Sequence, residues 1–595
     1  IGTIDASTTS PDHAPAVDLA TARRVEVVRG PATLLYGNNA VGGVINILDG
    51  RIPTALPSAG QRALMRLGYG ANADEVLAAG AVDTAIGSQV VLHVSAFARD
   101  AGDYEVPGYV RSARLRALEE HDHGDEDHDE DHAHEEEARG RLENSGTAQT
   151  SGTAGLSVLG DWGFLGVSLS GLTSRYGLPV GHEHGHGEEH DEDHDEDHGH
   201  GHEDGVSIDL DQFRFDLAGE IQGEFLAFET TRLRFGHADY EHVELEGDEV
   251  GTRFLNEGWE GRVELVQKKA ASFGGDWSGA IGFQSSGRDF DARGEEAFVP
   301  PSKTAQIGAF TMQQVDLGAL SIQAGARIER QTIESDAVAF DRDFTGISLS
   351  AGAGYTLPGG WLIGASLART ERAPNAEELL SDGPHLATAT YEVGDPTLGE
   401  ETAHSVEGTL KYADDRRFGA LNLFYTDYSD FIYEAFTGAE EDDLPVARFR
   451  AADARFWGVE VEVGTTLAAG PGTVTLDGAV EYVRATDRDA DRPIPRIPPL
   501  SARATLGYEL AEIAGRLELV WADDQGREGP FELETQGYTV LNAALDWHPF
   551  GGDAVTLLAE VRNLTDEEVR HSTSFLKDQL AQPGRDYRLS LRAAF

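Results

Sequence analysis

Apolar and polar side chains alternate with a period of two along most of the chain, from residue 61 to the last residue. Residues 457–463 (WGVEVEV) and 587–595 (YRLSLRAAF) show the pattern most clearly. A period of two places successive side chains on opposite faces of a β-strand. The pattern therefore predicts a long series of strands, each with one apolar face and one charged or small-residue face.

Two architectures share this pattern, a water-soluble sandwich and a membrane barrel, and periodicity alone does not separate them. Two features favour the barrel. Roughly 535 residues of alternating pattern run without a domain break, and the chain ends on an aromatic residue, Phe595, within a strand. At about 24 residues per strand and connection, this length allows about 22 strands. No segment approaches 18 consecutive apolar residues, so no transmembrane helix is predicted.

A shorter, turn-rich region precedes the strands. Two β-type runs, 25–28 (VEVV) and 43–47 (GVINI), flank the turn signals Gly30-Pro31 and Gly37-Asn38-Asn39. Residues 51–60 (RIPTALPSAG) have the composition of a linker. The sequence thus predicts a small module over residues 1–50, a linker over 51–60 and the large β-structure over 61–595.

Net charge and residue types exclude several classes of function. The chain has 104 acidic and 47 basic residues, a net charge of −57, which argues against nucleic acid and suits cations. It has no cysteine, which excludes disulfides and thiolate metal sites. Because no HExxH, GxSxG or P-loop motif is present, we do not expect an enzyme.

Two tracts, residues 119–137 and 182–204, break the alternation and share the octet DEDHDEDH. They hold 13 of the 21 histidines and 23 of the 104 acidic residues. Such charged runs predict disordered loops. Histidine with carboxylate suits borderline divalent metals, zinc first among them, so we expect many weak, exchangeable sites. The alternative is a solvated anionic loop with incidental histidines. The candidate ligands are His121, His123, His128, His132, His134, His182, His184, His186, His190, His194, His198, His200 and His202.

A tighter site is expected deeper in the molecule. Asp12 and His13 are adjacent ligands of complementary type in the turn SPDHAP, although an Asx-type turn with an exposed histidine also fits. In the predicted strand 231–246, Leu233 and Phe235 mark the lipid face. The opposite parity then directs one imidazole and two carboxylates toward the lumen or its mouth, unless this end of the strand is a polar extension in water. These candidates are His242, Glu244 and Glu246.

His385 is the third candidate ligand. Residues 375–380 predict a short helical turn, and Gly383-Pro384 ends it. A histidine directly after that break is expected to project from a loop over the lumen. The alternative is an isolated histidine without a ligand.

Residues 25–47, VEVVRGPATLLYGNNAVGGVINI, resemble the plug domain of TonB-dependent outer-membrane receptors. This resemblance implies an all-β membrane protein of Gram-negative bacteria, in which a plug lies inside an antiparallel transmembrane barrel of about 22 strands. Its implied partners are outer-membrane lipid and the inner-membrane TonB complex. Compared with the family, we expect the front of the plug and the TonB-contacting segment to be missing from the chain.

The motifs PDHA (11–14), YGLPVGHEH (176–184) and PNAEELL with GPHLAT (374–388), together with the acidic histidine-rich loops, resemble the zinc-receptor branch of that family. The branch implies a zinc ion between plug and barrel. Carried over by motif, its ligands are Asp12, His13, one of Glu244 or Glu246, and His385. Zinc or another divalent transition metal is then the transported ligand, and no catalytic cofactor is expected.

Two other readings remain open. The same fold could carry nickel, copper, cobalt, haem or a metallophore such as a siderophore. Alternatively, the protein could be a surface metal buffer or adhesin whose plug never moves.

Overall fold

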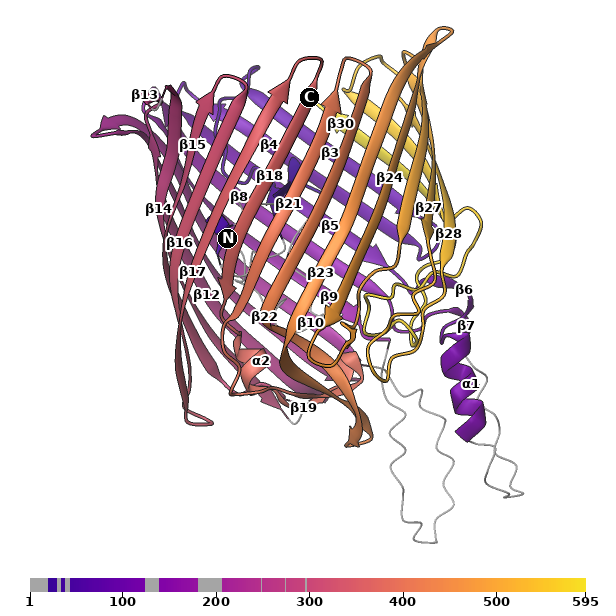
Figure 1. Cartoon of the computed structure of the whole chain (residues 1–595). Coiled ribbons are helices and arrows are strands. Elements are labelled where there is room, and N and C mark those ends of the chain that lie inside the picture. Colours follow the sequence, from indigo (N-terminus) through magenta and orange to yellow (C-terminus); the bar gives the residue numbers. More distant parts are fainter. Residues whose placement is uncertain are drawn as a thin grey trace.

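The last strand of the chain, β30 (Asp586–Ala594), pairs with β3 (Gln61–Gly70) and closes one large sheet into a barrel (Figure 1). The computed structural model describes residues 16, 20–28, 34–37, 43–122, 138–179, 206–247, 249–272, 274–294 and 297–595, and only the backbone of residues 119–122, 246 and 386. Closure leaves the sheet without an open edge that would need a partner.

Within the described residues, 22 strands cross the barrel wall, each antiparallel to its neighbours, which confirms the predicted fold class. Between β3 and β30 these are β4 (Glu75–Ile86), β5 (Val90–Ala101), β8 (Thr147–Gly160), β9 (Gly163–Gly177), β10 (Val206–Phe225), β11 (Phe228–Glu246), β12 (Glu249–Gln267), β14 (Gly275–Gly294), β15 (Ser302–Leu317), β16 (Leu320–Ser335), β17 (Phe340–Leu357), β18 (Trp361–Arg372), β21 (Glu401–Ala413), β22 (Arg417–Glu441), β23 (Leu444–Ala469), β24 (Gly472–Asp487), β26 (Ser501–Glu509), β27 (Ile513–Ala522), β28 (Tyr538–Trp547) and β29 (Val555–Arg562).

The remaining strands and helices are shorter. Four short strands join the barrel sheet: β13 (Ala270–Ser272), β19 (Asp382–His385), β20 (Thr390–Val393) and β25 (Arg492–Pro493). Two-stranded sheets form from β1 (Arg24–Val28) with β2 (Val44–Leu48), and from β6 (Glu105–Tyr109) with β7 (Arg139–Arg141). The described residues form the α-helices α1 (Ala113–Asp122) and α2 (Ala376–Leu380) and a 3-10 helix, Leu386–Thr388. None of the helices in the described part of the chain is long and apolar enough to cross a bilayer.

The outer wall of the barrel is apolar. On β17, Ile347 and Leu349 keep 45% and 49% of their surface exposed, whereas Ser348 and Ser350 between and after them are buried. Burying a small hydroxyl while exposing a large aliphatic side chain reverses the order found in a water-soluble sandwich. The exposed apolar face is therefore the face that meets lipid, as in membrane barrels.

The two ends of the barrel differ. Tight turns join the strands at the end that holds the C-terminus, whereas α1, α2 and β19 lie at the opposite, long-loop end (Figure 1). The tract predicted as a loop over 119–137 begins inside α1, because the backbone of 119–122 is helical. Residues 123–137 and the second tract, 182–204, lie outside the described residues.

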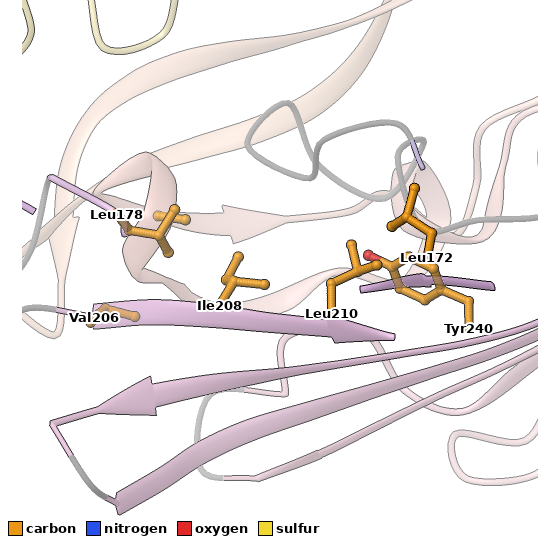
Figure 2. Close-up of a cluster of buried hydrophobic side chains, with 7 residues drawn as sticks. Leu172, Leu178, Val206, Ile208, Leu210 and Tyr240 are labelled. Atoms are coloured by element: carbon orange, nitrogen blue, oxygen red, sulfur yellow. The ribbon is translucent and has the colours of Figure 1, made fainter. Parts of the chain in front are cut away.

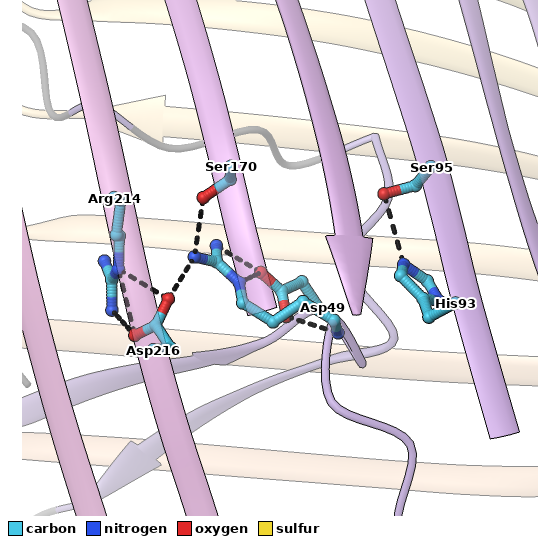
Figure 3. A network of polar contacts seen from close by, with 7 residues as sticks. Asp49, His93, Ser95, Ser170, Arg214 and Asp216 are labelled. Carbon is cyan, nitrogen blue, oxygen red and sulfur yellow. Dashed lines mark hydrogen bonds and ion pairs between the residues drawn. The ribbon is translucent and has the colours of Figure 1, made fainter. Parts of the chain in front are cut away.

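Ion pairs hold the N-terminal segment against the inner wall. After β2, the Arg51 guanidinium donates to Asp49 Oδ2 over 2.5 Å and to Asp216 Oδ2 of β10 over 2.9 Å (Figure 3). Arg214 shares Asp216 at 2.7 Å, and Arg23 pairs with Asp83 of β4 at 2.9 Å. The segment before the linker is thereby fixed to two separate parts of the barrel.

Replacing Arg51 with alanine is expected to loosen this attachment. It removes the basic partner that Asp49 and Asp216 share, although Asp216 keeps Arg214, and costs about 2 kcal/mol. This is less than for a fully buried pair because Arg51 retains 27% exposure. The change is measured as the urea concentration at which a protease releases half of the N-terminal segment; this urea midpoint should fall. Arg232→Ala, which removes an exposed pair with Glu220, should leave that midpoint nearly unchanged.

Candidate metal-binding site

His242 and Glu244 lie on the inner face of β11 near the long-loop end. The pairing of β11 with β10 has no register shift between Thr231 and Glu244, so the side chains at even positions in this range face inward. His242 is 0% exposed and Glu244 is 6% exposed. The Nε2 atom of His242 lies 3.9 Å from Glu244 Oε1, and its Nδ1 lies 3.0 Å from the Tyr240 hydroxyl. This places one imidazole and one carboxylate side by side, as the alternation predicts.

Two phenylalanines connect this pair to His385. The His242 ring stacks on Phe254 with 4.4 Å between centroids, and the His385 ring stacks on Phe298 at 4.3 Å. Phe254 and Phe298 contact each other at 6.3 Å. Both phenylalanines are about 1% exposed. The two histidines therefore flank one aromatic core, which fixes the planes of both rings.

The loop after β18 is anchored so that His385 is buried. Asn375 caps α2, its side chain accepting a hydrogen bond from the Glu378 N–H, while Glu378 accepts one from the Asn375 N–H. Arg288 on β14 then pairs with Glu377 at 2.8 Å. His385 ends β19 and is 3% exposed, so it does not project from a loop over the lumen as we expected from its sequence. The difference arises because β19 pairs with β20, and β20 in turn pairs with β23 of the barrel wall.

Glu392 on β20 orients the His385 ring. Its Oε1 lies 2.7 Å from His385 Nδ1, and the Thr388 hydroxyl lies 3.1 Å from the same nitrogen. An ionised carboxylate can only accept, so Nδ1 carries the proton and the Nε2 lone pair is presented for coordination. We call His242, Glu244, His385 and Glu392 the deep site.

A further buried carboxylate, Glu434, lies beside the deep site. It belongs to the part of β22 that continues beyond the exposed apolar Leu423 and Tyr425, outside the membrane-spanning segment. Burial has the largest effect on the pKa of Glu434, and repulsion from Glu392 adds to it. Together they raise this pKa to about 8. Within the described residues its Oε1 has no hydrogen-bond partner. A neutral Glu434 keeps the negative charge beside His385 low at neutral pH.

This pKa makes stability depend on pH. Between the ordinary value of 4.5 and about 8, the folded protein holds a proton on Glu434 that the unfolded chain has lost, so stability falls as pH rises through this range. In metal-free protein, Glu434→Gln should therefore gain thermal stability over the wild type increasingly from pH 5 to pH 9. A difference that is the same at every pH in a melting series would contradict this assignment.

The N-terminal segment reaches the same region. Ala16 packs against a cluster of buried apolar side chains that includes Tyr240 and Ala387 (Figure 2). Tyr240 contacts His242, and Ala387 follows His385 by two positions. The other members are Leu172, Leu178, Val206, Ile208 and Leu210. A residue close to the PDHA motif thus packs against a cluster that has members next to both halves of the deep site.

Several predicted ligands cannot be placed. Asp12 and His13 lie outside the described residues, as do all tract histidines except His121. For His121 and Glu246, only the backbone is described, in α1 and at the end of β11. Within the described ranges the deep site consists of two His–Glu pairs, and these do not bring three ligand atoms within 4.8 Å of one another.

Sequence reasoning did not single out Glu392, Glu434, Phe254 or Phe298. Glu392 carries a weak signal, because it is two positions after Thr390, the partner of His385 in the β19–β20 hairpin. That signal can be used only when the pairing of β19 with β20 is already known. Glu434 follows a register shift between Tyr428 and Phe431, which a simple period of two does not anticipate.

Comparison with known proteins agrees with this architecture. Residues 135–564 match the family model "TonB dependent receptor-like, beta-barrel", and residues 3–44 match "TonB-dependent Receptor Plug Domain". The copper transporter OprC has a similar structure, with a TM-score of 0.77 and 16% identity over 97% of this chain and 86% of that chain. The FrpB iron transporter from Neisseria meningitidis (F3-3 variant) gives 0.72 and 14% over 97% and 88%. The hemophore receptor HasR of Serratia marcescens, solved as a double mutant with its hemophore HasA and heme, gives 0.71 and 13% over 97% and 87%.

Sequence identities of 13% to 16% show a shared fold but do not indicate which ligand this chain transports. The family model, in contrast, covers most of the barrel, and the plug model covers the N-terminal segment. The chain therefore belongs to the TonB-dependent receptors, plugged β-barrels of the Gram-negative outer membrane that transport a ligand across that membrane and are not enzymes.

Proposed function

We propose that this receptor takes up a divalent transition metal, with zinc as its main cargo. The observation that carries the proposal is the pair of buried His–Glu contacts, His242 with Glu244 and His385 with Glu392, held on one aromatic core at the long-loop end. That end of an outer-membrane barrel faces the cell exterior. Buried imidazole and carboxylate groups in proximity are costly unless they are paired or bind a cation.

In this proposal Asp12 and His13 of the plug complete the site, with His242, His385 and one of Glu244 or Glu246 from the barrel. Support comes from Ala16, which packs against the buried cluster that contains Tyr240 and Ala387. At most about 3.5 Å of chain per residue separates Ala16 from His13, so the motif is within reach of either half of the deep site. A metal held between plug and barrel is released when the plug moves.

The donor set favours zinc among divalent ions. Neutral imidazole and carboxylate oxygen are ordinary zinc ligands, whereas calcium and magnesium take oxygen donors alone. The chain lacks cysteine, so thiolate selection of softer metals is impossible. Copper(II) binds similar donors, often more tightly, and is the nearest competitor. The two histidine-rich tracts act in this proposal as an outer tier that concentrates metal through weak, exchangeable binding.

Accumulation of metal in cells tests this function. In a Gram-negative host without its own zinc receptor, the chain should raise zinc uptake under zinc limitation only when TonB is present. Nickel, copper and haem supplied singly under the same conditions provide the comparison. Uptake of haem with no uptake of zinc would overturn the proposal.

Glu392→Gln should weaken the deep site without removing a ligand. The amide keeps the shape of the side chain but holds His385 Nδ1 less strongly, and loss of such a supporting carboxylate typically costs about 10- to 100-fold in metal affinity. Zinc titration of the purified receptor measures the change. Glu407→Gln, a half-buried carboxylate on β21 that accepts a hydrogen bond from Ser366, serves as the matched control.

A further inference from the structure

His237, Asp239 and Glu257 form a cluster of possible metal ligands away from the deep site. Each offers one ligand atom, and these three atoms all lie within 4.8 Å of one another. Of these, His237 Nε2 and Asp239 Oδ2 are 3.5 Å apart. Two donors on a tetrahedral zinc with bonds of about 2.0–2.1 Å lie about 3.4 Å apart, so the pair already has the required spacing.

The cluster faces outward from the barrel. On β11, Ala238 and Tyr240 are buried inside, and the alternating residues His237 and Asp239 therefore point away from the lumen. His237 pairs across the strands with Trp259, and Asp239 pairs with Phe213. Trp259 and Phe213 keep 41% and 49% of their surface exposed. Aromatic side chains of this kind mark the boundary of the lipid band in outer-membrane barrels.

The arrangement places two like charges directly opposite each other. Asp239 and Glu257 are register partners on β11 and β12, which is unfavourable without a cation between them. Neither carboxylate forms an ion pair with lysine or arginine within the described residues. The next acidic side chain outward on β11, Glu241, differs, because it pairs with Arg253 at 3.3 Å. On this face, Glu241 therefore has an arginine as its partner, whereas Asp239 and Glu257 have a histidine beside them.

We propose that His237, Asp239 and Glu257 bind a divalent transition metal on the outer wall, at the interface between lipid and water. One imidazole and two carboxylates provide three ligands, and the fourth position faces away from the wall, where water completes the coordination. The bound ion relieves the repulsion between Asp239 and Glu257. β11 then carries metal ligands on both faces, with His242 and Glu244 inside and this site outside. The outer site does not depend on the proposed transport function.

Anomalous diffraction at the zinc absorption edge tests the site directly. Crystals of the full chain equilibrated with micromolar zinc should show an anomalous peak among these three side chains. The peak should disappear in His237→Ala and in the double variant Asp239→Asn/Glu257→Gln, and it should persist in Glu241→Gln. All four positions are partly or largely exposed, so the variants are expected to fold.

A solution measurement separates this site from the deep site. In a chain without the two tracts and with His385→Ala, titration with zinc should still show binding that Asp239→Asn/Glu257→Gln abolishes. No anomalous peak in the wild type, or a peak that survives in the double variant, would overturn the proposal. A peak here with none at the deep site would support the outer site and count against the proposed function alone.

Discussion

Replacing His385 with alanine is expected to lower the affinity of the deep site for zinc by more than about 100-fold. His385 is 3% exposed, its Nδ1 is held by Glu392, and its ring is fixed against Phe298. Loss of a supporting group alone typically costs 10- to 100-fold, so loss of a pre-oriented ligand should cost more. Zinc titration of a chain without the two histidine-rich tracts measures the effect free of loop binding.

His404→Ala is the matched control, because His404 is an exposed histidine on β21, a strand of the barrel wall. Its removal should leave the affinity unchanged. Phe298→Leu provides a second comparison, since it weakens the stacking on His385 but keeps an apolar side chain. Equal loss of affinity in His404→Ala and His385→Ala would show that the titration reports surface binding, and the assignment of His385 would fail.

The double variant Asp12→Ala/His13→Ala is expected to abolish tight zinc binding while the barrel remains folded. In our account these plug residues close the site that the barrel leaves as two separate His–Glu pairs. Losing two ligands should remove measurable zinc binding at the deep site and leave binding at the outer cluster of His237, Asp239 and Glu257 unchanged. Asp5→Ala, which removes another acidic residue of the N-terminal segment, should have no effect.

Heat-modifiable migration on gels checks that the variant barrel is intact. If the double variant binds zinc as tightly as the wild type, the plug does not contribute ligands and the deep site is formed by the barrel alone.

Alternation along the strands predicted the β-structure, and its uninterrupted length and the terminal Phe595 favoured a barrel over a sandwich. A period of two sets which face each residue occupies, and the chain length sets how many strands fit, so an antiparallel barrel of about 22 strands was expected and found. The same parity argument placed His242 and Glu244 on the inner face of β11, where both are buried. The helical turn after Asn375 also formed as its sequence predicts.

The rest of the deep site depends on contacts between distant segments. Glu392 reaches His385 only because β19 and β20 fold back on each other, and Phe298 reaches it from another loop. Glu434 becomes buried after the register shift in β22. Apart from the weak signal for Glu392, no local pattern in the sequence indicates these contacts. The outer cluster was also missed, because His237 and Asp239 share the parity of the lipid-facing Leu233 and Phe235.

Calorimetric titration of the detergent-solubilised receptor with zinc, with and without the tracts 119–137 and 182–204, tests the central claim most directly. Our account predicts that deleting both tracts lowers the number of bound ions but leaves one tight site, which His385→Ala removes. Weak multiple binding that disappears with the tracts would contradict it and would instead favour a surface metal buffer.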